Sequence, residues 1–452
     1  MELTPHKILV NIQNKDIDKL VAVENLISLI ENSNFIRVRL DSIDILGQID
    51  VKNKKIFDLL ENLLVSDSNE SIRNAAANLL KDHYLDKALS PMKWALQHDE
   101  SPYALNTIFE ALITIIKNLE KSSDRTSRLD LIEEVNKIDE KEIKIGFEIL
   151  KETKTIEDIS NKDLVDILIN YYTLSFLKKT FWRLKHVIEN SKIVELDFIF
   201  KGLTSLPDAI KYLSSLKTLI LRYNQLIKLP DWIGSLKDLK CLNLNVNNLT
   251  KLPESIGKLN SLKELLLWKN ELSTLPESIG SVLSLEVLNL RLNRLEALPS
   301  SIGNLSSLKE LNLHDNKLSY VPRSIGSLSS LENLNLSWNE LTAIPESLGS
   351  IKTLKNLDLG RNELSIIPDS ISALSNLETL NLSENRIRII PKSIGSMSSL
   401  QVLNLSRNRL SEIPESLGSL TNLKELYLAE NNYVKIPKSI KLLKENDLKL
   451  FI

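Results

Sequence analysis

The C-terminal part of this 452-residue chain repeats one 23-residue pattern without insertion or deletion. The pattern is L-x-x-L-x-L-x-x-N-x-L-x-x-L-P-x-x-I-G-x-L-x-x, and eleven copies occupy residues 193–441. The first copy has Lys201 in the asparagine slot. The other ten copies have Asn224, Asn247, Asn270, Asn293, Asn316, Asn339, Asn362, Asn385, Asn408 and Asn431. A constant period means that each copy folds as the same unit and is stabilised by the copies on either side.

A period of 20–29 residues with this leucine spacing is typical of leucine-rich repeats. The segment L-x-x-L-x-L predicts a short strand in which Leu219 and Leu221 point inward. Stacking places these strands side by side, so we expect an α/β solenoid. Its form is a leucine-rich-repeat horseshoe with a parallel concave sheet.

Two further slots of the pattern have expected structural roles. An asparagine amide offers two donor hydrogens and one acceptor oxygen, which suits a ladder that satisfies backbone groups of its own and neighbouring turns. The glycine four residues after the repeat proline, such as Gly303, is expected to adopt a positive φ.

The N-terminal part has a different periodicity. Apolar residues recur at helical spacing through residues 15–178, which predicts an all-α domain over residues 1–178. The stretch from Val38 to Leu46 matches the stretch from Ile72 to Leu80 at an offset of 34. SNESIRNAAANLLKDHY resembles the second helix of a HEAT-type repeat, because its small alanines allow a paired helix to approach closely. A generic helical bundle is the alternative. Arg37 and Arg39 are expected to form a solvated or inter-helix ladder.

The joins between these parts complete the expected domain organisation. FWRLKHVIE, Asn190-Ser191-Lys192 and IVELDF predict an antiparallel hairpin within residues 179–198, which we expect to cap the solenoid. The leucine-rich-repeat domain then covers residues 193–441. A C-terminal cap is expected over residues 442–452, where the repeat pattern is lost.

Charge and cysteine content limit the possible functions. Residues 1–190 hold 26 basic and 32 acidic residues, giving −6, and the remainder holds 31 and 27, giving +4. Neither part has the basic excess of a nucleic-acid-binding domain. Cys241 is the only cysteine, and neither a signal core nor an apolar stretch of about 18 residues is present. We therefore expect a cytoplasmic protein with no membrane insertion and no nucleic-acid partner.

The variable positions after the strand leucines identify a candidate binding surface. Two columns follow these leucines, one through Arg222 and one through Tyr223, and both are expected on the concave face. Tyrosine, tryptophan and arginine are enriched at binding hot spots. The predicted binding residues are Arg222, Tyr223, Trp268, Arg291, His314, Trp338 and Arg361. They suggest a partner with an acidic, partly apolar surface. The alternative is that each residue is simply a solvent-exposed side chain of the sheet and binds no partner.

Motifs for chemistry are absent from the sequence. The chain has no G-x-x-x-x-G-K-[ST] loop and no H-E-x-x-H or paired-cysteine spacing, so we expect no cofactor and no metal. His314 beside Asp315 is not expected to act as an acid–base pair. Cys241 has no evident activating neighbour, so it is expected to be an inert packing residue rather than a catalytic thiol.

The LP-x-x-IG-x-L form of the repeat resembles cytoplasmic leucine-rich-repeat proteins of the Ras-suppressor and Scribble type. This resemblance covers residues 193–441 and does not extend to the HEAT-like leader. It implies a non-enzymatic scaffold or adaptor in signal transduction, with a small GTPase or its regulator as partner. The alternatives are a substrate-recruiting adaptor subunit of a ligase or phosphatase complex and a HEAT-like domain with lyase activity.

Overall fold

The structure is a computed structural model that describes residues 4–121, 125–155, 158–432, 435–440 and 448–452. The chain divides into two compact units, which are described here one at a time. Unit 1 consists of residues 1–184 and 188–193, and unit 2 consists of residues 185–187 and 194–452.

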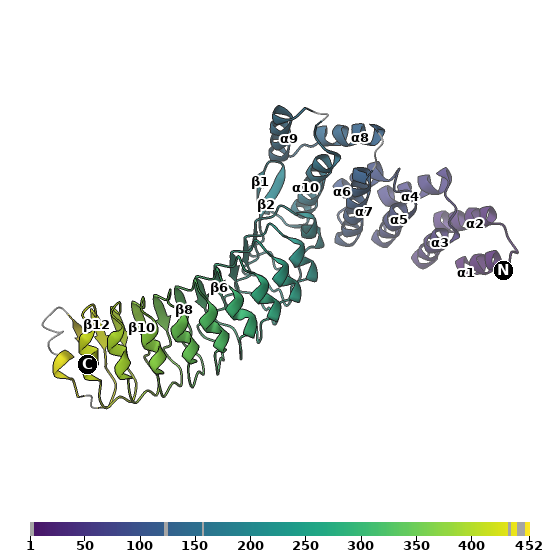
Figure 1. Cartoon of the computed structure of the whole chain (residues 1–452). Coiled ribbons are helices and arrows are strands. Elements are labelled where there is room, and N and C mark those ends of the chain that lie inside the picture. Colours follow the sequence, from purple (N-terminus) through teal and green to yellow (C-terminus); the bar gives the residue numbers. More distant parts are fainter. Residues whose placement is uncertain (1–3, 122–124, 156–157, 433–434, 441–447) are drawn as a thin grey trace. The chain divides into compact units, whose positions relative to one another are not determined.

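Unit 1 is a row of α-helices, drawn in purple and blue in Figure 1. Neighbouring helices pack as pairs, because each has an apolar face. The helices are α1 (Pro5–Gln13), α2 (Lys19–Asn32), α3 (Ile36–Ile49), α4 (Lys54–Ser66), α5 (Glu70–His83), α6 (Leu89–His98), α7 (Pro102–Lys121), α8 (Arg125–Asn136), α9 (Lys141–Thr153) and α10 (Asn161–Thr180). Helix α5 packs against α4, α3 and α7, and its Ala76 and Ala77 are fully buried.

Two ion pairs connect successive helical repeats. Arg39 of α3 pairs with Asp67, and Arg73 of α5 donates from Nε to Asp99 Oδ2 over 2.6 Å. The two arginines are 34 residues apart, which is the offset of the repeat. Arg39 therefore takes part in an inter-helix ladder, as the sequence suggested. Both carboxylates are largely buried, and pairing with arginine offsets the cost of removing their charge from water.

A single thirteen-stranded sheet follows, with its strands ordered as they occur in the chain. Strands β1 (Lys185–Glu189) and β2 (Lys192–Asp197) form a hairpin whose turn residues Asn190 and Ser191 have φ of 49° and 63°. All pairings from β2 to β13 are parallel. The remaining strands are β3 (Thr218–Ile220), β4 (Cys241–Asn243), β5 (Glu264–Leu266), β6 (Val287–Asn289), β7 (Glu310–Asn312), β8 (Asn333–Asn335), β9 (Asn356–Asp358), β10 (Thr379–Asn381), β11 (Val402–Asn404), β12 (Glu425–Tyr427) and β13 (Lys449–Phe451).

In the described part of the chain, ten coils of the solenoid return through a short 3₁₀ helix that begins after the repeat proline. These helices are η1 (Asp208–Tyr212), η2 (Asp231–Ser235), η3 (Glu254–Lys258), η4 (Glu277–Ser281), η5 (Ser300–Asn304), η6 (Arg323–Ser327), η7 (Glu346–Ser350), η8 (Asp369–Ala373), η9 (Lys392–Ser396) and η10 (Glu415–Ser419). The inward leucines of strand and return segment are buried together, as Leu311, Leu313 and Leu318 show. The expected α/β solenoid with a parallel sheet and an all-α HEAT-like N-terminal domain is confirmed.

The asparagine ladder is also confirmed. Asn316 is 7% exposed, and its Nδ2 donates to the carbonyl oxygens of Leu313, over 3.1 Å, and Leu290, over 3.0 Å. Its Oδ1 accepts from the backbone N–H of Leu295 over 3.0 Å. One side chain therefore joins its own turn to the preceding coil. Leaving these groups unpaired would cost about 1–3 kcal/mol for each group.

The expected role of the repeat glycines is wrong. Among the described glycines, only Gly202 has a positive φ. Gly303 lies inside η5, where a Cβ atom would meet the carbonyl oxygen of Ser324 in the next coil at 2.2 Å. The glycine is therefore required for close approach between coils. A glycine in a repeat can indicate either a positive φ or a close backbone approach, and the sequence pattern does not distinguish these two causes.

The predicted C-terminal cap over residues 442–452 lies partly outside the described residues. Of this segment, Leu448–Ile452 are described, and β13 adds to the sheet beside β12.

Replacement of Leu311 by alanine should lower the free energy of unfolding by about 2–5 kcal/mol. The side chain is 1% exposed and lies among leucines of adjacent coils, which cannot close the cavity fully. Chemical denaturation followed by circular dichroism measures the change. Leu283→Ala is the matched control, because Leu283 is 56% exposed and its loss should change stability by less than about 0.5 kcal/mol.

Gly303→Ala should destabilise the solenoid although the backbone at this position suits any residue. The added methyl group would force the coils of η5 and η6 apart, which we expect to cost about 1–3 kcal/mol. Thermal unfolding of the purified variant tests this expectation. An unchanged melting temperature would show that the neighbouring coil shifts without cost.

Candidate protein-binding surface

The outward side chains of the strands form a largely uncharged surface, which we call the sheet floor. In β7–β11 the floor consists of Glu310, Asn312, Asn333, Asn335, Asn356, Asp358, Thr379, Asn381, Val402 and Asn404. A hollow of about 700 Å³ lies over these strands and β12. Amide groups dominate its lining, so the floor can exchange hydrogen bonds with a ligand and contributes little charge.

The floor asparagines also shape the end of each strand. The Oδ1 atom of Asn312 accepts from the backbone N–H of His314 over 3.1 Å, and Asn335 accepts from Ser337 over 3.0 Å. This bond between a side chain and the backbone two residues later turns the chain away from the sheet. It leaves Nδ2 of Asn312 and Asn335 without a hydrogen-bond partner within the described part of the chain.

The residue before each ladder asparagine, or before Lys201 in the first copy, forms a second surface feature, which we call the ridge. Its φ lies between 54° and 60° in every coil. The ridge residues are Phe200, Tyr223, Val246, Lys269, Leu292, Asp315, Trp338, Arg361, Glu384, Arg407 and Glu430. A left-handed conformation at a residue with a side chain costs about 1–3 kcal/mol and persists only where surrounding bonds impose it. Here the backbone N–H of Tyr223 donates to the Asn245 carbonyl of the next coil over 3.0 Å.

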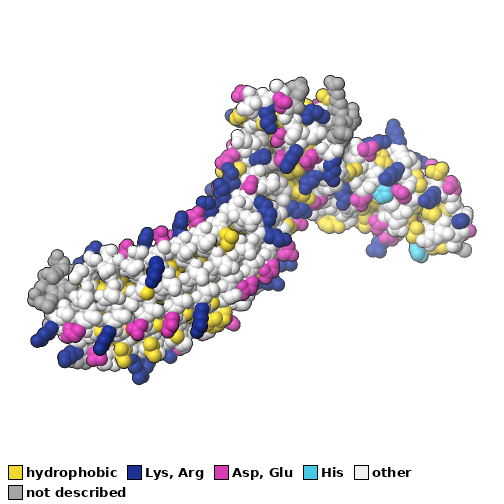
Figure 2. Space-filling view, viewed as in Figure 1, with side chains coloured by type: hydrophobic (Ala, Val, Ile, Leu, Met, Phe, Trp, Pro, Cys, Tyr) yellow, Lys and Arg dark blue, Asp and Glu magenta, His cyan; other side chains and the backbone are white. Residues whose placement is uncertain are grey.

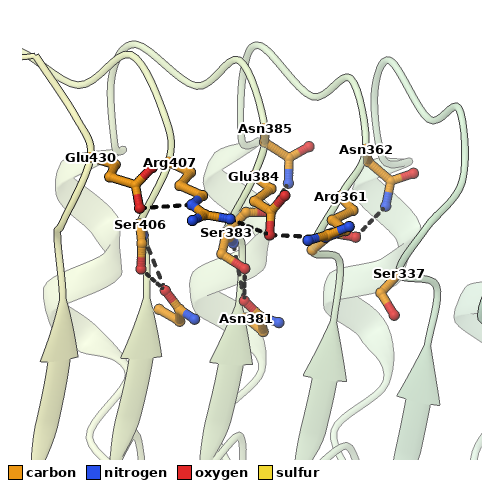
Figure 3. A network of polar contacts seen from close by, with 12 residues as sticks. Ser337, Arg361, Asn362, Asn381, Ser383, Glu384, Asn385, Ser406, Arg407 and Glu430 are labelled. Atoms are coloured by element: carbon orange, nitrogen blue, oxygen red, sulfur yellow. Dashed lines mark hydrogen bonds and ion pairs between the residues drawn. The ribbon is translucent and has the colours of Figure 1, made fainter.

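Five consecutive ridge side chains are linked to one another. The Arg361 guanidinium lies 3.9 Å from the centre of the Trp338 ring and 2.9 Å from the Glu384 carboxylate. Arg407 then bridges Glu384, at 3.4 Å, and Glu430, at 2.9 Å. Figure 3 shows this line of alternating charges crossing from coil to coil above the strand ends. Both arginines are therefore neutralised within the chain.

The seven predicted binding residues all follow the ends of their strands, in the turn that leads to the ladder asparagine. Arg222 and Tyr223 are exposed, and Tyr223 stacks on Phe200 with ring centres 4.6 Å apart. The Arg222 guanidinium lies 5.9 Å from the centre of the Tyr223 ring. These two predicted residues form one group near the start of the solenoid, with Phe200 as a member that the prediction did not include.

Trp268 lies separately from that group. Its side chain is half-buried, and the indole N–H is shielded from solvent and has no acceptor among the residues that the structure describes. Its backbone N–H donates to Asn245 Oδ1 over 2.8 Å. Trp268 is therefore less exposed than the sequence suggested, because the neighbouring coils cover part of the ring.

The structure brings the other four predicted residues together. Arg291, His314, Trp338 and Arg361 line a second hollow of about 340 Å³. Trp338 is 46% exposed, and its ring meets the His314 ring edge-on with centres 6.1 Å apart. Arg291 is exposed and forms no ion pair with a residue that the structure describes.

His314 is held as a neutral ring. Burial lowers the pKa of its imidazole below 6.5, and the nearby Arg291 charge lowers this pKa further. Its Nδ1 lies 2.8 Å from Ser337 Oγ. The ring is thus engaged with a hydroxyl in the next coil, and no hydrogen bond to Asp315 holds it as an acid–base pair in the described chain.

The sequence-based prediction missed the floor residues beside the central leucine. A signal was present, because six copies spell Leu-Asn-Leu at this point. Their asparagines are Asn243, Asn289, Asn312, Asn335, Asn381 and Asn404. The two predicted columns lie after the strand, whereas these asparagines lie within it.

Cys241 shows no sign of nucleophilic activation. Burial, together with the adjacent Glu264 carboxylate 3.5 Å from the sulfur, raises the pKa of its thiol to about 12. The thiol stays protonated near neutral pH, whereas a nucleophilic cysteine requires a lowered pKa.

Unit 1 contains a hollow of about 670 Å³ between α5, α6, α7 and α8. Its acidic lining includes Glu133 and Glu134, which pair with Lys137. Within the described ranges, no three histidine, cysteine or carboxylate side chains are grouped closely enough to hold a metal ion. The same ranges contain no helix with the length and apolar character needed to cross a bilayer.

Charged side chains are mixed in sign over the visible surface. Figure 2 shows lysines and arginines interspersed with aspartates and glutamates along the edges of unit 2, and much of the face between them is uncharged. No single-sign field therefore dominates this face, in contrast to the basic footprint of a nucleic-acid-binding protein.

Comparison with known families assigns both repeat types. The description "Leucine-rich repeat region" matches residues 181–273 and 265–365, and related leucine-rich-repeat descriptions match residues 376–397 and 398–443. The description "HEAT repeats" matches residues 23–113. A search of curated proteins found no match.

Solved structures resemble the solenoid. A leucine-rich-repeat protein of Leptospira interrogans is 43% identical, with a TM-score of 0.53, over 57% of this chain and 65% of its own. The leucine-rich-repeat ectodomain of the Arabidopsis receptor kinase HAESA is 34% identical, with a TM-score of 0.49, over 58% of this chain and 46% of its own. This chain therefore spans less than two thirds of either structure.

An NMR titration of His314 should give a pKa below 6.5, and Arg291→Gln should raise that pKa part of the way back. The charge of Arg291 is then absent, whereas burial of the ring remains. Because the folded state binds this proton less readily than the unfolded state, the stability contribution of the neutral ring falls as pH drops below about 6.5. A pKa that does not respond to Arg291→Gln would place the two side chains too far apart to interact.

Proposed function

We propose that this chain, a leucine-rich-repeat protein with HEAT repeats ahead of the solenoid, is a non-enzymatic scaffold that binds a partner protein on its concave face. The observation that carries the proposal is the contrast between the two sides of each coil. The repeat leucines are buried inside the solenoid, whereas tryptophan, tyrosine and arginine side chains are exposed on the ridge and beside it. Aromatic and arginine side chains of this kind provide most of the binding energy at protein interfaces.

The arrangement suits a macromolecular partner better than a small substrate. The predicted residues extend from the coil of β3 to the coil of β9, six strand spacings of about 4.8 Å, or about 29 Å. The two hollows above the sheet are partly open to solvent, which favours contact with a protein surface over enclosure of a small substrate. A partner protein would contact separate groups of side chains along this length.

The partner class that we propose is a small GTPase or a regulator of one, acting in the cytoplasm. Support comes from the resemblance of the repeat to Ras-suppressor and Scribble-type proteins. Affinity purification from native lysate with the full chain as bait, performed with a GTP analogue and with GDP, tests the class. Capture that depends on the nucleotide supports it, and capture of a ligase or phosphatase subunit without nucleotide dependence supports the adaptor alternative instead.

Replacement of Trp268 and Trp338 by alanine should weaken binding of the recovered partner by about 30-fold or more, as expected for hot-spot residues that contribute at least about 2 kcal/mol. Thermal stability should change little, because neither ring belongs to the leucine core. Surface plasmon resonance measures the affinity. Trp182→Ala is the control, because Trp182 is 74% exposed and lies in unit 1. Equal affinity of the double variant and the wild type would exclude these rings from the interface.

A further inference from the structure

The repeat that contains β9 departs from its neighbours at two positions. The floor slot holds Asp358, where the preceding and following coils hold Asn335 and Asn381. Two residues later, Gly360 replaces the serine of both neighbours, Ser337 and Ser383. One coil has therefore gained a negative charge and lost the side chain beside it.

Gly360 is not required by the backbone. Its φ is not positive, in contrast to Gly202, and the residue is buried. A Cβ atom at this position would lie 2.9 Å from Asn381 Nδ2 and 3.2 Å from Asp358 Oδ1. The absence of a side chain therefore lets the Asn381 amide and the Asp358 carboxylate lie close to the backbone at this position. Asp358 and Asn381 line both hollows of the concave face, and Gly360 lines the smaller one.

The Asp358 carboxylate is only partly used by the fold. Its Oδ1 accepts from the backbone N–H of Gly360 over 3.0 Å and from Asn381 Nδ2 over 2.9 Å. An asparagine would accept both bonds with its own Oδ1, as Asn335 does for Ser337. The Oδ2 atom accepts no hydrogen bond and the carboxylate forms no ion pair among the described residues. The negative charge is therefore not needed for the turn.

The surroundings of Asp358 favour a positive group from outside. Arg361, the ridge cation of the same coil, is already neutralised by Glu384 and stacked on Trp338. His314, which also lines the hollow, is held neutral by its lowered pKa. The exposed Trp338 ring offers an apolar surface for an aliphatic stem. Arg291 is the remaining cation in the lining, and it belongs to the coil of β6, three coils away from β9.

We propose that the hollow over Asp358 and Gly360 receives a basic side chain, lysine or arginine, of the protein that binds the concave face. The charged end would pair with Asp358 Oδ2, and the stem would lie against Trp338. This inference rests on the proposed scaffold function and adds the chemistry of one contact. It is compatible with acidic partner groups opposite Arg222 and Arg291, since those arginines belong to other coils.

The test uses the full chain and a displayed library of random twelve-residue peptides. Wild type, Asp358→Asn and the double variant Asp358→Asn/Gly360→Ser are each immobilised and screened. The double variant restores the residues of the neighbouring coils, so it should fold, with a small shift of the Asn381 amide away from the added side chain. Glu310→Gln is the matched control, because it removes another floor carboxylate, and Glu310 does not line the smaller hollow that contains Asp358, Gly360 and Trp338.

Peptides selected by wild type and by Glu310→Gln should share a lysine or arginine, and their affinity for Asp358→Asn should be about tenfold weaker in fluorescence anisotropy. Exchange of the shared basic residue for glutamine should weaken wild-type binding equally and should not affect binding to Asp358→Asn. Selected peptides without a common basic residue, or with equal affinity for Asp358→Asn, would overturn this inference and leave the scaffold function standing. Failure of every variant to enrich peptides over an uncoated surface would count against both.

Discussion

The amide side chain that links one coil to the next is the interaction on which the solenoid depends. Asn316 and its counterparts donate to carbonyl groups of two coils and accept from a backbone N–H of the preceding coil. These backbone groups lie at turns that the sheet does not pair, and burial would otherwise leave them unsatisfied. Because the ladder satisfies them, the leucines of every coil can close into a continuous apolar interior.

The same linkage determines which side chains remain outside. To bring the asparagine inward, the preceding residue adopts a left-handed conformation, and its side chain projects from the edge of the coil. Core formation therefore places one exposed side chain per coil on the ridge. The fold does not determine the type of this side chain, so it can vary with function. Its C-terminal half carries alternating charges that pair with each other, whereas Phe200 and Tyr223 form an aromatic stack at the other end. Different coils therefore present different chemistry on one backbone.

In a repeat protein, equivalent positions of different coils can be compared with one another. Each coil shows which residues the fold accepts at a given position of the repeat. The hydrogen bond from the Gly360 backbone N–H to Asp358 is matched in the next coil by the bond from Ser383 to Asn381. Asp358 and Gly360 therefore form no turn hydrogen bond that the neighbouring residues could not form. Departures that do not help the fold are candidates for function. By the same comparison, the repeat glycines are structural, since a Cβ atom at Gly303 or at any of its counterparts would meet the corresponding serine of the next coil, in most coils at the backbone oxygen.

The sequence alone determined the period, the inward leucines, the asparagine ladder and the presence of HEAT-like helices, because these depend on contacts between identical slots of successive copies. The tertiary structure decided the rest. It showed that Gly303 serves coil packing instead of a positive φ, that Arg361 is paired with Glu384, and that four of the seven predicted residues share one hollow. Pairing between variable side chains depends on the spacing of coils and on side-chain direction. A pattern of letters specifies neither of these, because it records which residues share a column and not which of them meet.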